Sequence, residues 1–166
     1  MEDSVFISLC QSQYKAAFKM LENLIEECPD ELWNKESKVP PFWQQIYHIL
    51  YYLDFYSEDT KETFKQTFSI EENLDERFDE ILSKEELLKY TNKLKNKINT
   101  KLELLTTKKL ESKSAFFWTG ANVAEKIIYS LRHAQHHIGQ LNYLLKIETN
   151  SATKWILTGS DKPRKG

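Results

Sequence analysis

Three of the chain's four histidines lie within five residues, at positions 133, 136 and 137. The surrounding segment, LRHAQHHIGQLNYLL, has apolar residues at three- and four-residue steps, which predicts a helix. His133 and His137 are four residues apart, so they lie on one face of that helix and can present their nitrogens to one ion. His136 points about 100° away from His137, toward solvent. This spacing predicts that His133 and His137, but not His136, bind a metal ion.

The fourth histidine, His48, supplies a possible third ligand. Catalytic zinc sites usually have three protein ligands and one open position. His48 lies in FWQQIYHILYYLDFY, among apolar and aromatic residues, where an unpaired polar ring is costly. Two helices of a bundle often hold a metal between them in this way. Two simpler interpretations stay open. An HxxxH pair can be an incidental surface feature, and His48 can be a core histidine bonded to a hydroxyl or carbonyl.

Three polar neighbours are candidates for tuning such an ion. Gln44 and Tyr52 lie one turn to either side of His48 and could orient its ring. Gln140 lies on the histidine side of the last helix and could hydrogen-bond a ligand or a water molecule. Each has an ordinary alternative, since Tyr52 could pack among the aromatic residues around it and Gln140 could line a polar groove.

Four segments with helical periodicity must position these residues. They span about residues 4–27, from the end of VPPFW to Tyr56, 83–105 and 122–146. Pro29 ends the first, and Ser83 with Glu86 forms a capping box at the start of the third. The connections 57–82 and 106–121 are long, which permits a crossover. We therefore predict an all-α four-helix bundle in one domain, residues 1–166, with a short packed turn around Trp155.

The bulk composition excludes several classes of protein. A net charge of −2 does not indicate a nucleic-acid partner, which would favour a positively charged protein. No apolar run approaches the roughly 20 residues that span a bilayer. The first residues, MEDSVFISLCQSQ, lack a signal peptide, so we expect a cytoplasmic protein without a membrane partner. Cys10 and Cys28 are expected to be reduced thiols. Phosphate-binding loops and the GxSxG motif are absent.

Both histidine motifs resemble those of a known family. HAQHHIGQL resembles the HxxxHxGQ signature on the last helix of the DinB-like superfamily, and ELWNKESKVPPFWQQIYHILYYLDFY is similar to its second-helix motif. The resemblance covers about residues 5–146. It implies a four-helix bundle with up-down-down-up topology, often a homodimer. It also implies a divalent metal ion, commonly zinc or nickel, with positions open to water and with His48, His133 and His137 as ligands.

Two residues of the last-helix motif limit what the resemblance implies. His136 lies between the two ligand positions of the signature and is not implied as a ligand. Ile138 stands where many relatives have arginine, so any contact of that arginine with an anionic cosubstrate is missing here.

Characterised relatives include metal-dependent transferases and isomerases that use small cellular thiols. The resemblance therefore implies a thiol-dependent S-transferase, in which a metal-activated thiolate attacks a small electrophilic substrate and a low-molecular-weight thiol is the cosubstrate. The same site would also serve a metal-dependent hydrolase of a small ester or amide. A non-enzymatic, metal-stabilised interaction or stress-response module is the third possibility.

Overall fold

Four long helices form the fold in the computed structural model, which describes residues 3–157 and 159. They are α1 (Asp3–Glu27), α3 (Phe42–Ser57), α4 (Lys84–Glu103) and α6 (Val123–Thr149). Two short helices, α2 (Asp30–Trp33) and α5 (Thr107–Glu111), and two 3₁₀ turns, η1 (Lys61–Thr63) and η2 (Phe117–Thr119), lie between them. The described residues contain no strand beyond one isolated bridge between Lys113 and Asn122. The predicted all-α class is confirmed.

Helices α4 and α6 begin where local side chains can satisfy their first backbone N–H groups. At α4 the Ser83 hydroxyl accepts from the N–H of Glu86, and the Glu86 carboxylate accepts from the N–H of Ser83. This is the capping box that the sequence predicts. At α6 the Asn122 side chain accepts from the N–H of Glu125. Helix α3 follows Pro41, whose fixed φ suits a first turn.

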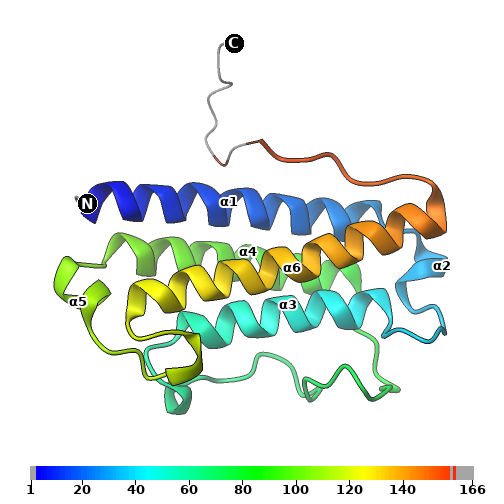
Figure 1. The fold of residues 1–166 in the computed structure, drawn as a ribbon. Coiled ribbons are helices and arrows are strands. Elements are labelled where there is room, and N and C mark those ends of the chain that lie inside the picture. Colours follow the sequence, from blue (N-terminus) through cyan, green and yellow to red (C-terminus); the bar gives the residue numbers. More distant parts are fainter. Residues whose placement is uncertain (1–2, 158, 160–166) are drawn as a thin grey trace, which may run out of the picture.

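The four long helices form a ring in which α1 and α3 each pack against both α4 and α6. The connection after α3 runs back along the outside of the bundle before α4 begins (Figure 1). Helices α3 and α4 therefore run in the same direction, and α1 and α6 run in the opposite one (Figure 1). This arrangement places the middle of α3 beside the middle of α6, where the histidines lie.

A buried apolar core holds the ring together. Its fully buried side chains come from all four long helices and include Leu21, Leu24, Ile46, Ile49, Leu50, Leu87 and Leu141. Burial of this apolar area is the dominant favourable contribution to the free energy of folding. The predicted packed turn around Trp155 is wrong, because that side chain is 68% exposed and residues 151–157 have no regular structure. Thr153 is the buried anchor there, since its N–H donates to Asn142 Oδ1.

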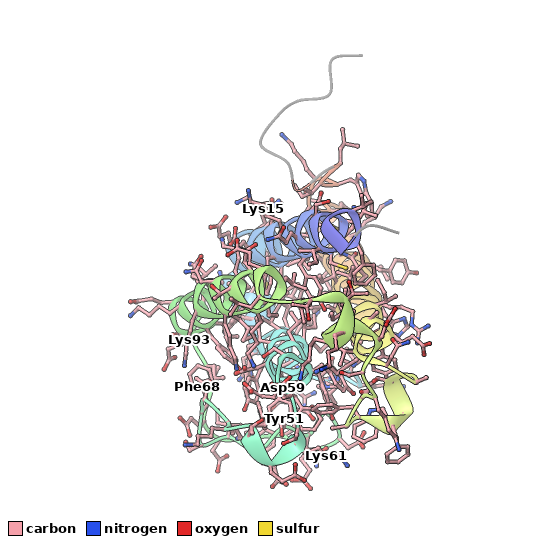
Figure 2. All side chains as sticks on the ribbon, turned by 90° about the vertical axis from the view of Figure 1, so that its left-hand side faces the viewer. Lys15, Tyr51, Asp59, Lys61, Phe68 and Lys93 are labelled. Carbon is pink, nitrogen blue, oxygen red and sulfur yellow. The ribbon has the colours of Figure 1, made fainter. Side chains whose placement is uncertain are left out.

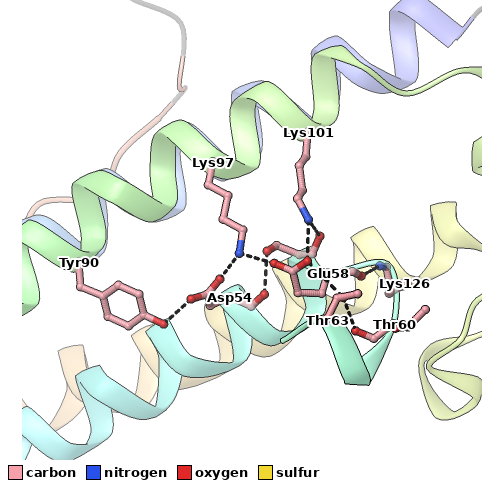
Figure 3. Close-up of polar contacts among 9 residues, drawn as sticks. Asp54, Glu58, Thr60, Thr63, Tyr90, Lys97, Lys101 and Lys126 are labelled. Atoms are coloured by element: carbon pink, nitrogen blue, oxygen red, sulfur yellow. Dashed lines mark hydrogen bonds and ion pairs between the residues drawn. The ribbon is translucent and has the colours of Figure 1, made fainter. Parts of the chain in front are cut away.

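Charged residues join α3 to the parallel helix α4 (Figure 3). Lys97 on α4 pairs with Asp54 of α3 and with Glu58, the residue that follows α3, and Lys101 pairs with Glu58. The Tyr90 hydroxyl donates to the other oxygen of Asp54, at 2.8 Å. Each buried carboxylate therefore has a cationic or hydroxyl partner, which offsets the cost of removing it from water.

The long connection is fastened to α3 by hydrogen bonds to its backbone. The Tyr47 hydroxyl donates to the carbonyl of Ile70 at 2.9 Å, and the Gln44 amide donates to the carbonyls of Asn73 and Glu76. Glu72 lies between these anchors and is held against the outer face of α3. None of the helices in the described range is long and apolar enough to cross a membrane.

Candidate metal centre

The structure brings three histidines together from two helices. His48 comes from α3, and His133 and His137 come from α6. Their ring centroids lie 5.2 Å (His48 to His133), 4.5 Å (His48 to His137) and 4.6 Å (His133 to His137) apart. One ring nitrogen from each lies within 4.8 Å of those of the other two, so the three could hold a metal ion. His136 is exposed, as its position on the helix predicts.

Hydrogen bonds fix which nitrogen of two of these rings carries a proton. Nδ1 of His48 lies 2.6 Å from a carboxylate oxygen of Glu72, and Nδ1 of His137 lies 2.7 Å from the amide oxygen of Gln140. Both partners are acceptors, so each Nδ1 carries a proton, and in the neutral ring each Nε2 then carries a lone pair. These two Nε2 atoms are 3.2 Å apart. Two lone pairs at this distance repel each other unless a cation binds both.

The surroundings of the rings determine their charge. Burial, followed by the charges of the neighbouring histidines, lowers the pKa of His133 to about 4. Burial and then the nearby His48 lower the pKa of His137 to about 4 as well. Both rings are therefore neutral near pH 7. Neutral imidazole is the form that binds metal ions.

The separation of one pair of ring nitrogens matches the size of a transition-metal ion. Two nitrogens bound to one zinc ion at roughly 2.0–2.1 Å each and at a tetrahedral angle lie about 3.3–3.4 Å apart. The observed distance between Nε2 of His48 and Nε2 of His137 is 3.2 Å. Three imidazoles with no carboxylate among them suit zinc, nickel or copper better than calcium or magnesium.

Glu72 is the partner that sequence reasoning missed. Burial alone would raise the pKa of this carboxyl, but hydrogen bonds from His48 and Tyr52 outweigh it and lower the pKa. Glu72 is therefore ionised and accepts the Nδ1 proton of His48. A carboxylate in this position fixes the ring and makes its other nitrogen more basic toward a metal. The sequence segment EENLDERFDE gives no local signal for Glu72, since it contains several equivalent acidic residues.

The three predicted tuning residues have different places in the structure. Gln140 contacts His137 directly, as described above. The Tyr52 ring packs 4.8 Å from the ring of His48 and 5.1 Å from that of His133, and its hydroxyl is bonded to Glu72. Gln44 does not orient His48 directly. It is only 2% exposed and holds the backbone that follows Glu72, so the connection rather than Gln44 supplies the partner of His48.

Ile138 is 1% exposed and belongs to the apolar core. It offers no charge to the space beside the histidines, in agreement with the missing arginine noted in the sequence.

The family of the chain follows from its sequence. The sequence model of the DinB superfamily matches residues 13–141, a range that includes all three histidines and the whole of α3 and α4. The chain belongs to the DinB superfamily. No curated protein and no solved structure matches the sequence. The resemblance inferred from the two histidine motifs is confirmed, and the fold agrees with an all-helical DinB-like bundle.

Proposed function

We propose that this DinB-like protein binds a divalent cation, zinc or nickel, through His48, His133 and His137, and that it is a metal-dependent enzyme. The proposal rests on the 3.2 Å separation of Nε2 of His48 and Nε2 of His137, with an acceptor against Nδ1 on the opposite side of each ring. A divalent cation bound to both Nε2 atoms would suit this separation. The low pKa of His133 and His137 keeps both rings neutral near pH 7, the form of imidazole that binds metal ions.

The reaction that we propose is transfer of a low-molecular-weight thiol to a small electrophile. When bound to three neutral imidazoles, the ion keeps its full charge and lowers the pKa of a thiol or water beside it. In the overall reaction a carbon–sulfur bond forms, the bond to the leaving group breaks, and the thiol proton ends on the leaving group. The chain's own contribution is orientation, since Glu72 fixes His48 and Gln140 fixes His137.

Aromatic side chains shape one side of this site. Tyr52 covers His48 and His133, and Tyr56 stacks on Tyr52 with ring centroids 5.7 Å apart. Such a wall limits the access of water and offers apolar contact to an organic substrate. Homodimer formation, which the family resemblance implies, is part of the same proposal.

Metal content tests the ligand assignment. Elemental analysis of the untagged protein is expected to give about one divalent ion per chain. We expect His48→Ala and His133→Ala to lose it, because two imidazoles seldom hold zinc in a protein. His136→Ala is the matched control, since it removes an exposed histidine from the same helix and should retain the ion. Equal metal content in all four proteins would overturn the assignment.

Spectroscopy and turnover test the thiol chemistry. In the cobalt- or nickel-loaded protein, binding of a small thiol near the ion is expected to change the visible absorption spectrum. Addition of an electrophile should then consume the thiol, and chelator should stop this reaction. If no thiol in a panel changes the spectrum, the transferase proposal is wrong. Ester hydrolysis that needs the metal but no thiol would instead indicate a hydrolase.

A further inference from the structure

A cavity separate from the histidines lies at one end of the bundle, where α3 ends and α6 begins. Its volume is about 480 Å³, within the usual range for small-molecule sites. Apolar side chains from the long helices make up most of its wall, among them Leu53, Ile98, Leu102 and Ile127. Figure 2 looks onto this end of the molecule, and Asp59, which lines the cavity, lies near its centre. None of the three histidines lines this cavity.

Three lysines also line the cavity, and they differ in how their charge is balanced. Lys101 pairs with Glu58 at 3.0 Å, and Lys109 pairs with Asp59 at 2.9 Å. Lys126 has no such carboxylate in the part of the chain that the structure describes. Its ammonium donates to the backbone carbonyl of Glu58, as Figure 3 shows, and lies 5.0 Å from the centre of the Phe116 ring.

Lys126 is a buried cation with too few partners. It is only 5% exposed. An ammonium group carries three N–H donors, and here one of them meets a carbonyl oxygen. A buried charge is costly unless an opposite charge lies against it. The cost is visible in the pKa of Lys126, which burial lowers to about 8. An anion at the lysine end of the cavity would remove this cost.

We propose that the cavity binds a small amphiphilic carboxylate, with its apolar body against the leucine and isoleucine side chains and its carboxylate against Lys126. The charges around the cavity favour a monoanion. Lys97, Lys101, Lys109 and Lys126 are four cations in this network, and Asp54, Glu58 and Asp59 are three carboxylates, so one positive charge remains to be balanced. A neutral apolar ligand would leave that charge unpaired, and a dianion would exceed it. This proposal does not depend on the metal chemistry proposed above.

Three probes with the same eight-carbon chain test the proposal in the intact, metal-loaded protein. They are octanoate, 1-octanol and octylamine, which is cationic near pH 7. We expect octanoate to bind roughly tenfold or more tightly than octanol, because it forms a charge-assisted hydrogen bond that the alcohol cannot form. Octylamine should bind most weakly. Calorimetric titration gives the affinities, and methyl chemical shifts of Ile98 and Ile127 locate the ligand.

A matched pair of variants assigns the preference to one lysine. Lys126→Met keeps the length of the side chain and removes its charge, so it should bind octanol as before and octanoate no more tightly than octanol. Lys93→Met makes the same change on the exposed side of α4, at a residue that does not line the cavity, and should retain the preference. Metal content should be the same in both variants, which separates this site from the histidine site.

Three results would overturn the proposal. The first is equal affinity of the wild-type protein for octanoate and octanol, and the second is no octanoate binding at millimolar concentration. The third is a Lys126→Met protein that still prefers octanoate. Should Lys126→Met fail to fold, the wild-type comparison decides by itself, together with the shifts of the two isoleucine methyl groups.

Discussion

At the scale of single residues, the Nε2 atoms of His48 and His137 matter most for metal binding. Their tautomers follow from acceptors on the far side of each ring, Glu72 for one and Gln140 for the other. The metal-binding atoms are therefore oriented before any ion arrives. Such preorganisation removes part of the entropic cost of binding. Of the two acceptors, Glu72 is charged and largely shielded from solvent, so it should contribute more.

We predict that Glu72→Gln weakens metal binding. Glutamine can still accept the proton of His48 Nδ1, but it brings no negative charge, so His48 becomes less basic. A change in such a partner typically costs about 10–100-fold in metal affinity. Competition with a chromophoric chelator measures this loss. Glu71→Gln is the control, because it makes the same charge change on the exposed neighbour. Equal affinities of the two variants would show that Glu72 does not support the site.

At the scale of elements, the start of α6 determines where His133 and His137 lie. Gly120 precedes it with φ of 139°, a value that side chains with a Cβ rarely adopt. The N–H of Ala121 then donates to the Glu125 carboxylate at 2.9 Å, and Asn122 caps the helix. A Cβ at Gly120 would also clash with the side chain of Glu125. Gly139 differs, since it lies within α6 and has open space around it.

Alanine substitutions at these two glycines are expected to change the free energy of unfolding in opposite directions. Gly120→Ala should destabilise the protein by about 1–3 kcal/mol, through backbone strain and the contact with Glu125. Gly139→Ala should stabilise it by up to about 1 kcal/mol, because alanine loses less entropy in a helix. Urea unfolding monitored by circular dichroism measures both changes. A Gly120→Ala protein as stable as the wild type would contradict the role of this turn.

Sequence patterns predict the long helices well because each carries its own signals. Capping by Ser83 and Asn122, and proline before α3, fix the starts of three helices to within a residue or two. The short helices α2 and α5 were not predicted. Helices of four and five residues are too short to show periodicity, and packing against the long helices stabilises them. The exposure of Trp155 was not predicted either, because no local sequence pattern distinguishes a tryptophan that packs into the core from one that faces solvent.

In the candidate site, too, some residues could be predicted from the sequence and others could not. The ligand set could be predicted because His133 and His137 share a helix face and His48 is the one remaining histidine. Glu72 and the cavity beside Lys126 could not, because both depend on how distant segments meet. The path of the connection along α3 selects Glu72 from its acidic neighbours, and the ends of several helices enclose the cavity.

At the scale of the whole molecule, an ion held by His48, His133 and His137 would link α3 to α6. We therefore predict that chelator lowers the melting temperature by several degrees, because an ion that binds only the folded state stabilises it. Differential scanning calorimetry with and without chelator measures the shift. His133→Ala should melt at one temperature under both conditions, and His136→Ala should behave as the wild type. A wild-type protein indifferent to chelator would contradict the link.

The charge network between α3 and α4 predicts a dependence on pH. Burial would raise the pKa of Glu58, but hydrogen bonds from Lys97 and Lys101 outweigh it and lower the pKa. Because the folded pKa lies below that of the unfolded chain, about 4.3, the contribution of Glu58 is complete above that pH and is lost on acidification. Glu58→Gln should destabilise the protein at about pH 7, with a difference that shrinks below about pH 4. Urea unfolding across this range measures it, and exposed Glu26→Gln should show no such change.

Because of the path of the long connection, different segments determine where the three imidazoles lie and how strongly His48 donates to an ion. The three imidazoles project from rigid helices, whereas the carboxylate behind His48 projects from a segment without regular structure. Substitutions confined to that segment can alter how strongly one imidazole donates electrons to an ion, while every ligand keeps its position. Divergence among relatives in this stretch would then retune the reactivity of a shared centre without rebuilding the helical frame.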